Sequence, residues 1–107
     1  MPKFLIEANY TAEGHQGLAK DTASGRKAVL AQAARKMGGK LDAMYFCLGE
    51  HDAIVIMDMP DHISAAAVAS AACASGAART STSVLLTPAE MDEALAKPVN
   101  YRAPGAS

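Results

Sequence analysis

The sequence predicts an α+β fold in which one four-stranded antiparallel sheet carries helices on one face. Two apolar runs between Met44 and Pro60 flank a polar turn at residues 49–52, which is typical of a hairpin at the centre of a sheet. Strand-like and helix-like segments follow one another in the order β-α-β-β-α-β, with a further helix at the C-terminus. This order is the split βαβ, or ferredoxin-like, arrangement.

The individual elements follow from side-chain periodicity and from residues that begin or end helices. The strands are expected at residues 3–10, 40–48, 53–59 and 79–86. The helices are expected at residues 14–37, from Asp61 to Gly76 and from Thr87 to Pro98. Glycines interrupt the first helical segment, so a short piece capped by Thr11 and a longer one capped by Ser24 are expected. The Ala-rich middle helix is expected to turn six residues inward, namely Ile63, Ala66, Ala67, Ser70, Ala71 and Ala74.

Length, charge and composition bound the class of protein. The formal net charge of −1 and the aromatic fraction of 5% argue against a nucleic-acid partner. No leader is visible at Met1, and no apolar run approaches the roughly 18 residues of a membrane span. The two cysteines lack the spacing of a disulfide framework. We therefore expect a cytoplasmic protein with no membrane partner, in which residues 1–97 form the domain and residues 98–107 a loose tail.

The expected third strand predicts that the chain associates with itself. Helices cover one face of such a sheet, so the other face should be polar. Instead Val55 and Met57 line one side of this strand, while Ile54 and Ile56 line the other. Burying each large aliphatic side chain is worth roughly 1.5–3 kcal/mol. A homodimer or higher homo-oligomer through the sheet face is therefore expected; the alternative is that the last helix and tail fold over that face.

The polar turn, the apolar strand after it and residues 59–61 together resemble the GYD domain family, named for a Gly-x-Tyr-Asp hairpin. The resemblance covers roughly Pro2 to Ala96. It implies a dimeric α/β barrel, in which two sheets pack into one barrel-like body. No established activity comes with it, although the wider fold group includes cofactor-free monooxygenases, stress-response proteins and small-molecule-binding domains. His51 stands where the family usually has tyrosine.

Polar and reactive side chains near the strands are the candidates for chemistry or binding. An imidazole beside a carboxylate suits a general base, and a thiolate–imidazole pair is a second possibility. The catalytic candidates are therefore His51, Asp52 and Cys47. The ligand-binding candidates for a cleft between sheet and helices are Tyr10, Thr11, Tyr45 and His51, with Arg26 and Arg79 for an anionic ligand. Structural roles compete with these, since Asp52 suits a turn and the tyrosines and Cys47 suit a packed core.

Three functional hypotheses follow. The leading one is a homodimeric α/β barrel that binds a small organic molecule or a partner, with neither a cofactor nor a metal site, since the three histidines lack ligand spacing. The alternative is a cofactor-independent monooxygenase or isomerase whose cleft is lined by Tyr10, Tyr45 and His51. A thiol-based sensor built on Cys47 is the third.

Overall fold

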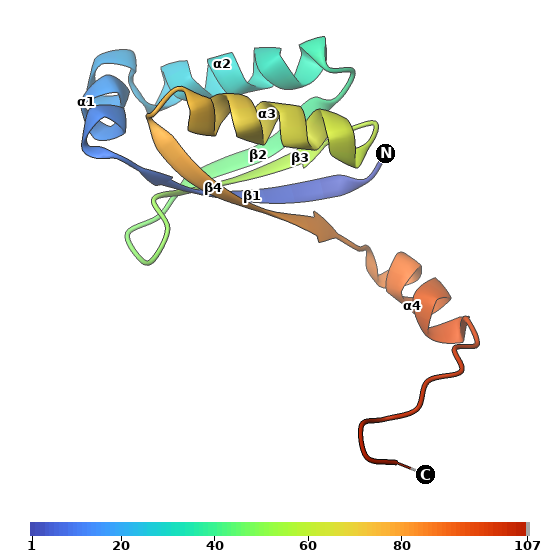
Figure 1. Cartoon of the computed structure of the whole chain (residues 1–107). Helices are drawn as coiled ribbons and strands as arrows, with labels where there is room; N and C mark the ends of the chain where they lie inside the picture. Colours follow the sequence, from blue (N-terminus) through green and yellow to red (C-terminus); the bar gives the residue numbers. More distant parts are fainter. Residues whose placement is uncertain (107) are drawn as a thin grey trace.

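The computed structural model describes residues 1–106 and consists of a helix-covered sheet and a C-terminal extension (Figure 1). The strands are β1 (Lys3–Tyr10), β2 (Lys40–Phe46), β3 (Ala53–Asp58) and β4 (Ala78–Leu85). The helices are α1 (Ala12–Asp21), α2 (Ala23–Lys36), α3 (His62–Ala74) and α4 (Pro88–Ala96). Neighbouring strands pair antiparallel in the order β2-β3-β1-β4. The predicted ferredoxin-like α+β fold is therefore confirmed.

The β2–β3 hairpin differs from its prediction in position and in register. β1 and β3 are the central strands, and β2 forms an edge of the sheet rather than its centre. The pairing of β2 with β3 shifts between Leu41 and Ala43, which marks a β-bulge. As a result, Leu41 and Met44 both pack against the core. Strict alternation along a strand would place residues three positions apart on opposite faces.

The break between α1 and α2 is a single residue, Thr22. Its backbone has a φ of +69°, a conformation that is uncommon outside glycine. In this turn the Thr22 hydroxyl accepts the Gly25 N–H at 3.1 Å, so Thr22 caps α2 and the predicted cap at Ser24 is wrong. The predicted cap of α1 is confirmed, because Thr11 accepts the Gly14 N–H.

The inward face of α3 is also not the predicted one. All six residues of the predicted stripe are exposed, and Ile63 is 70% exposed. The helix instead buries Ala65 and packs Val68 against the core. Side chains of nearly uniform small size give the two faces of a helix little hydrophobic contrast, so periodicity cannot select between them.

The core lies between the helices and one face of the sheet, which we call the inner face. Alternate residues of the two central strands fill it, together with Ala34 of α2 and Ala65 of α3. The strand residues are Phe4, Ile6, Val55 and Met57. Leu30 of α2 and Val68 of α3 pack against this cluster from the helix side.

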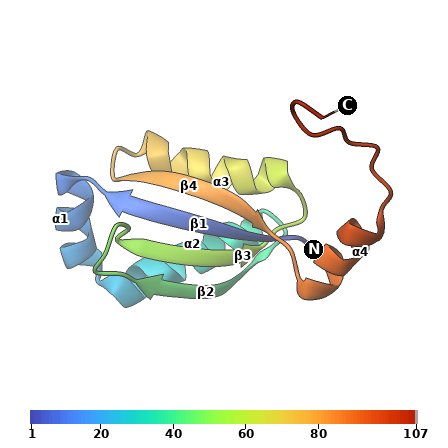
Figure 2. The ribbon, with the colours of Figure 1, turned by 90° about the horizontal axis from the view of Figure 1, so that it is seen from below.

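The opposite face of the sheet, called the outer face, has no helix over it in a single chain (Figure 2). Its middle is apolar and only partly covered, with Leu5 paired to Ile56 and Tyr45 paired to Ile54. Charged side chains lie on either side of this middle. The ion pairs are Lys3 with Asp42 and Asp58, and His51 with Glu7. The outer face is thus apolar at its centre and charged at two ends.

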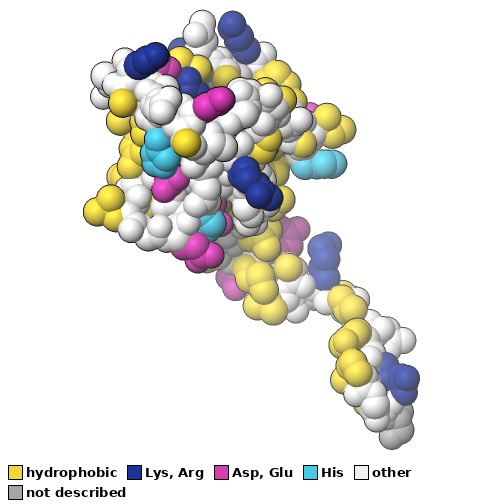
Figure 3. All heavy atoms as spheres, turned by 60° about the vertical axis from the view of Figure 1, so that its left-hand side comes forward, with side chains coloured by type: hydrophobic (Ala, Val, Ile, Leu, Met, Phe, Trp, Pro, Cys, Tyr) yellow, Lys and Arg dark blue, Asp and Glu magenta, His cyan; other side chains and the backbone are white. Residues whose placement is uncertain are grey.

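Residues 86–106, called the C-terminal arm, extend away from the sheet instead of folding over it (Figures 1 and 2). The predicted capping box of Thr87 and Glu90 is present, yet α4 has no buried residue. Hydrophobic side chains line the arm (Figure 3), the large exposed ones being Leu86, Met91, Leu95, Val99 and Tyr101. The radius of gyration is 17.0 Å, against about 13 Å for a compact chain of this length. The alternative of a tail folded over the outer face is therefore wrong for a single chain, while the domain boundary at residue 97 stays a prediction.

The N-cap of α3 predicts how the thermal stability of the protein depends on pH. The Asp61 carboxylate accepts the Ser64 N–H at 2.7 Å, and this bond lowers the pKa of Asp61 below its usual 3.8. A lowered pKa in the folded state contributes stability above the unfolded value, and the contribution is lost as pH falls through the folded pKa. Between about pH 5 and about pH 2 we expect the Tm to fall further for the wild type than for Asp61→Asn, whose cap does not titrate.

Thermal unfolding followed by circular dichroism measures this difference. Asp92→Asn removes a carboxylate from α4, which has no buried residue, and should follow the wild type. Parallel Tm curves for the wild type and Asp61→Asn would contradict the assignment of this cap as a titrating group.

Candidate functional site

A cavity of about 280 Å³ lies between the inner face of the sheet and helices α1, α2 and α3. Large apolar side chains from strands and helices line it, among them Ile6, Leu30, Met44, Val55, Met57 and Val68. α1 and α3 also contribute four small residues to the wall: Gly14, Gly17, Ala69 and Ala72. These helices therefore leave the space open instead of filling it. A concave and mostly apolar space of this kind is typical of sites for small organic ligands.

The α1 side of the cavity carries its charged groups and a phenol. Tyr10 at the end of β1, Glu13 and Asp21 in α1, and Arg26 in α2 all line it. Arg26 Nη1 lies 3.6 Å from Asp21 Oδ2. Burial of the ring raises the pKa of the Tyr10 phenol, while the neighbouring Arg26 guanidinium acts in the opposite direction. At neutral pH the cavity therefore presents a neutral phenol next to a cation.

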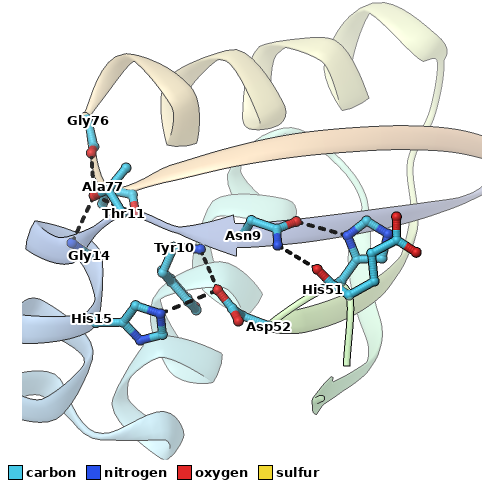
Figure 4. Close-up of polar contacts among 10 residues, drawn as sticks. Asn9, Tyr10, Thr11, Gly14, His15, His51, Asp52, Gly76 and Ala77 are labelled. Carbon is cyan, nitrogen blue, oxygen red and sulfur yellow. Dashed lines mark hydrogen bonds and ion pairs between the residues drawn. The ribbon is translucent and has the colours of Figure 1, made fainter. Parts of the chain in front are cut away.

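Thr11 fixes α1 at the edge of this cavity. Its N–H donates to Ala77 O at 2.9 Å, its hydroxyl donates to Gly76 O at 2.8 Å, and the same hydroxyl accepts the Gly14 N–H at 3.1 Å (Figure 4). The start of α1 is thereby bound to the residues just before β4. Thr11 does not line the cavity itself, so its role in the structure is to hold the wall.

Asp52 attaches the hairpin to the same junction. Its carboxylate accepts the backbone N–H of Tyr10 at 2.8 Å and lies 3.4 Å from His15 Nε2 (Figure 4). Tyr10 and His15 in turn have ring centroids 5.6 Å apart. Asp52 accepts a backbone N–H, as expected of a turn residue, but from a residue 42 positions earlier rather than from its own turn.

His51 points the other way, toward the outer face (Figure 4). Its Nδ1 lies 2.9 Å from Asn9 Oδ1 and its Nε2 lies 3.1 Å from Glu7 Oε2. Both partners are hydrogen-bond acceptors, so a protonated ring nitrogen can donate to either of them. His51 does not line the cavity.

The structure thus separates the residues that the sequence had grouped. Of the four ligand-binding candidates, only Tyr10 lines the cavity. Tyr45 is 64% exposed, and its partner across the β2–β3 ladder is Ile54 of the outer face. Cys47 is a partly buried free thiol whose N–H donates to Asp52 O at 2.8 Å. Catalytic roles for His51, Asp52 and Cys47 stay predictions.

Sequence reasoning missed three residues of the cavity wall. Glu13, Gly17 and Asp21 all line the space. Their spacing of four residues places them on one face of α1. This periodicity was visible in the sequence, but the face is polar and glycine-containing, so a search for apolar stripes passed over it.

Within residues 1–106, no helix has the length and hydrophobicity that crossing a membrane requires. Over the same residues, no group of three or more His, Cys, Asp or Glu side chains is arranged to hold a metal ion.

The fold and site define a small ferredoxin-like α+β domain with a helix-covered cavity and an open outer sheet face. The family profile described as GYD domain matches residues 4–95, so the chain belongs to the GYD domain family. Neither the curated proteins nor the solved structures gave a significant match. The family membership confirms the resemblance seen in the hairpin and in the Pro-Asp start of α3.

Proposed function

We propose that this protein binds a small organic molecule in the cavity between the inner face of the sheet and the helices. The observation that carries the proposal is the cavity itself, about 280 Å³ with mostly apolar walls. Unfilled apolar space costs a protein stability, roughly 24 cal/mol per Å³ of cavity volume in large-to-small substitutions. A ligand that binds the folded state stabilises it, so a ligand in this space would offset the cost in a chain of 107 residues.

The alternative of a cofactor-independent monooxygenase or isomerase gains no support from the geometry. That reading needs Tyr10, Tyr45 and His51 in one cleft. Tyr10 lines the cavity, whereas Tyr45 and His51 lie across the sheet on the outer face. A single neutral phenol beside an arginine does not make an acid–base pair with a nucleophile.

Filling the cavity tests the proposal. Ala72 of α3 lines the cavity, and its neighbour Ala71 is exposed on the same helix. With naphthalen-2-ol as the probe, we expect Ala72→Leu to weaken binding by about tenfold or more, because the larger side chain occupies the space. Ala71→Leu makes the same chemical change on the solvent side and should bind like the wild type. Isothermal titration calorimetry measures both, and an equal effect of the two variants would contradict the site.

A thermal-shift screen with small metabolites then searches for the physiological ligand. A molecule that binds only the folded state raises the Tm by mass action. Compounds that shift the wild type but not Ala72→Leu are ligands of this cavity. If no compound shifts the wild type and the probe does not bind, the chain is better understood as a protein-interaction module.

We also propose that two chains associate through their outer faces. Leu5, Ile54 and Ile56 support this, since they form a partly exposed apolar centre over which a single chain places no helix. Four strands about 4.8 Å apart and about eight residues long present a projected area of about 500 Å². A standard interface buries about 800 Å² on each partner. The C-terminal arm supplies the further apolar surface, so we propose that it packs on the second copy.

The two cysteine thiols bear on the cellular compartment of the protein. Cys47 and Cys73 are both free, and unpaired cysteines are typical of reducing compartments. We therefore propose the cytoplasm as the place where this protein acts.

A further inference from the structure

We propose that the cavity selects ligands whose polar head group is uncharged, and that it excludes carboxylates. This inference rests on the proposed function and specifies the chemistry of the same site. It stands on the charged side chains of the α1 side, which are Glu13, Asp21 and Arg26.

The charged side chains of the cavity disfavour an anionic head group. Arg26 is the cation of this cluster, and Asp21 already lies 3.6 Å from its guanidinium. Glu13 adds a second carboxylate to the cavity wall. The cluster therefore carries one positive and two negative charges, and a ligand carboxylate that approaches Arg26 must come close to Asp21. Asp21 already offsets the charge of the guanidinium, and its carboxylate repels a second one placed beside it.

A cationic head group is disfavoured for a different reason. The Arg26 guanidinium lies next to the Tyr10 phenol, where it opposes the burial that raises the pKa of that phenol. An ammonium group placed at Tyr10 would face this cation. The Asp21 side chain is 56% exposed against 32% for Arg26, so an ammonium that pairs with Asp21 moves toward solvent and draws the ligand body out of the cavity.

An uncharged oxygen avoids both costs. It can accept a hydrogen bond from the guanidinium or from the Tyr10 phenol, because both are donors. A neutral group also loses much less hydration than an ion when it leaves water. Together with the apolar walls, this chemistry fits neutral aromatic alcohols, aldehydes and ketones.

Three probes with one aromatic body separate these cases. Naphthalen-2-ol, 2-naphthoate and naphthalen-2-ylmethanamine carry a neutral, an anionic and a cationic head at pH 7. We expect calorimetry to give a Kd for the alcohol that is about tenfold or more lower than the Kd of either ion.

A pair of charge-neutralising variants assigns the discrimination to the cavity. Asp21→Asn should strengthen naphthoate binding by about threefold or more while leaving the alcohol within about twofold, because it removes the carboxylate beside Arg26. Asp92→Asn changes the net charge of the chain equally but lies on α4, outside the cavity. It should leave all three affinities unchanged.

The outcomes distinguish a failure of the head-group selection from a failure of the proposed binding site. Suppose that naphthoate or the amine binds as tightly as the alcohol and that Ala72→Leu weakens this binding. The head-group selection would then be overturned, and the cavity would remain the binding site. The same would follow if Asp92→Asn acted like Asp21→Asn. Binding of none of the probes, or binding indifferent to Ala72→Leu, would refute the proposed function and the selection with it.

Discussion

Gly14→Ala is expected to lower the free energy of unfolding by about 3 kcal/mol or more. A Cβ atom at this position would lie 1.9 Å from Ala77 O, far inside contact distance. Neither side can move away easily, because Thr11 binds both Gly76 and Ala77 through its backbone and its hydroxyl. The variant must break this junction or shift α1 from the sheet. Urea denaturation followed by circular dichroism measures the loss.

Gly17→Ala is the matched control in the same helix. A Cβ there would meet no atom within 4 Å. Because alanine favours a helix over glycine by about 1 kcal/mol, this variant should be as stable as the wild type or slightly more stable. Equal stability of the two variants would show that α1 does not approach Ala77 as closely as described.

Ile56→Lys is expected to convert the proposed dimer into a monomer, with a rise in the dissociation constant of about a hundredfold or more. Ile56 lies at the centre of the outer face, opposite Leu5 on one side and Ala43 on the other. A two-fold interface uses the same patch on both chains, so one substitution introduces two ammonium groups into it. Sedimentation velocity over a range of micromolar concentrations measures the change.

Ile63→Lys is the control for this experiment. Ile63 is 70% exposed on α3, on the helix side of the molecule. The same change in side chain and charge should leave the association intact, and far-UV circular dichroism should show both variants folded. A wild-type chain that sediments as a monomer at all these concentrations would remove the dimer from the proposed function.

The sequence predicts the fold well where local chemistry is distinctive. Thr87-Pro88 with Glu90 predicts the start of α4 correctly, because hydroxyl, proline and carboxylate each satisfy a specific need of a helix N-terminus. The helix start expected at Asp61 is confirmed in the same way, because Asp61 caps α3. Such signals depend on neighbouring residues alone, so no knowledge of distant contacts is required.

Where distant contacts decide, the sequence was insufficient. The orientation of α3 depends on Val68 finding the core, and the face that each β2 residue occupies depends on a bulge near Asp42. Tyr10, Tyr45 and His51 come from three separate strands or turns. Whether they share a cleft depends on which face of the sheet each one occupies. Only the register of the assembled sheet shows that Tyr10 faces inward and His51 outward.

The isolated position of α4 has a consequence for the life of the chain. A helix of nine residues gains too few internal hydrogen bonds to offset its nucleation cost in water, even with both halves of its N-terminal cap in place. Whatever surface receives the helix therefore also decides whether it stays wound. If a second copy supplies that surface, as proposed, dilution would leave residues 88–96 unwound and open to proteolysis.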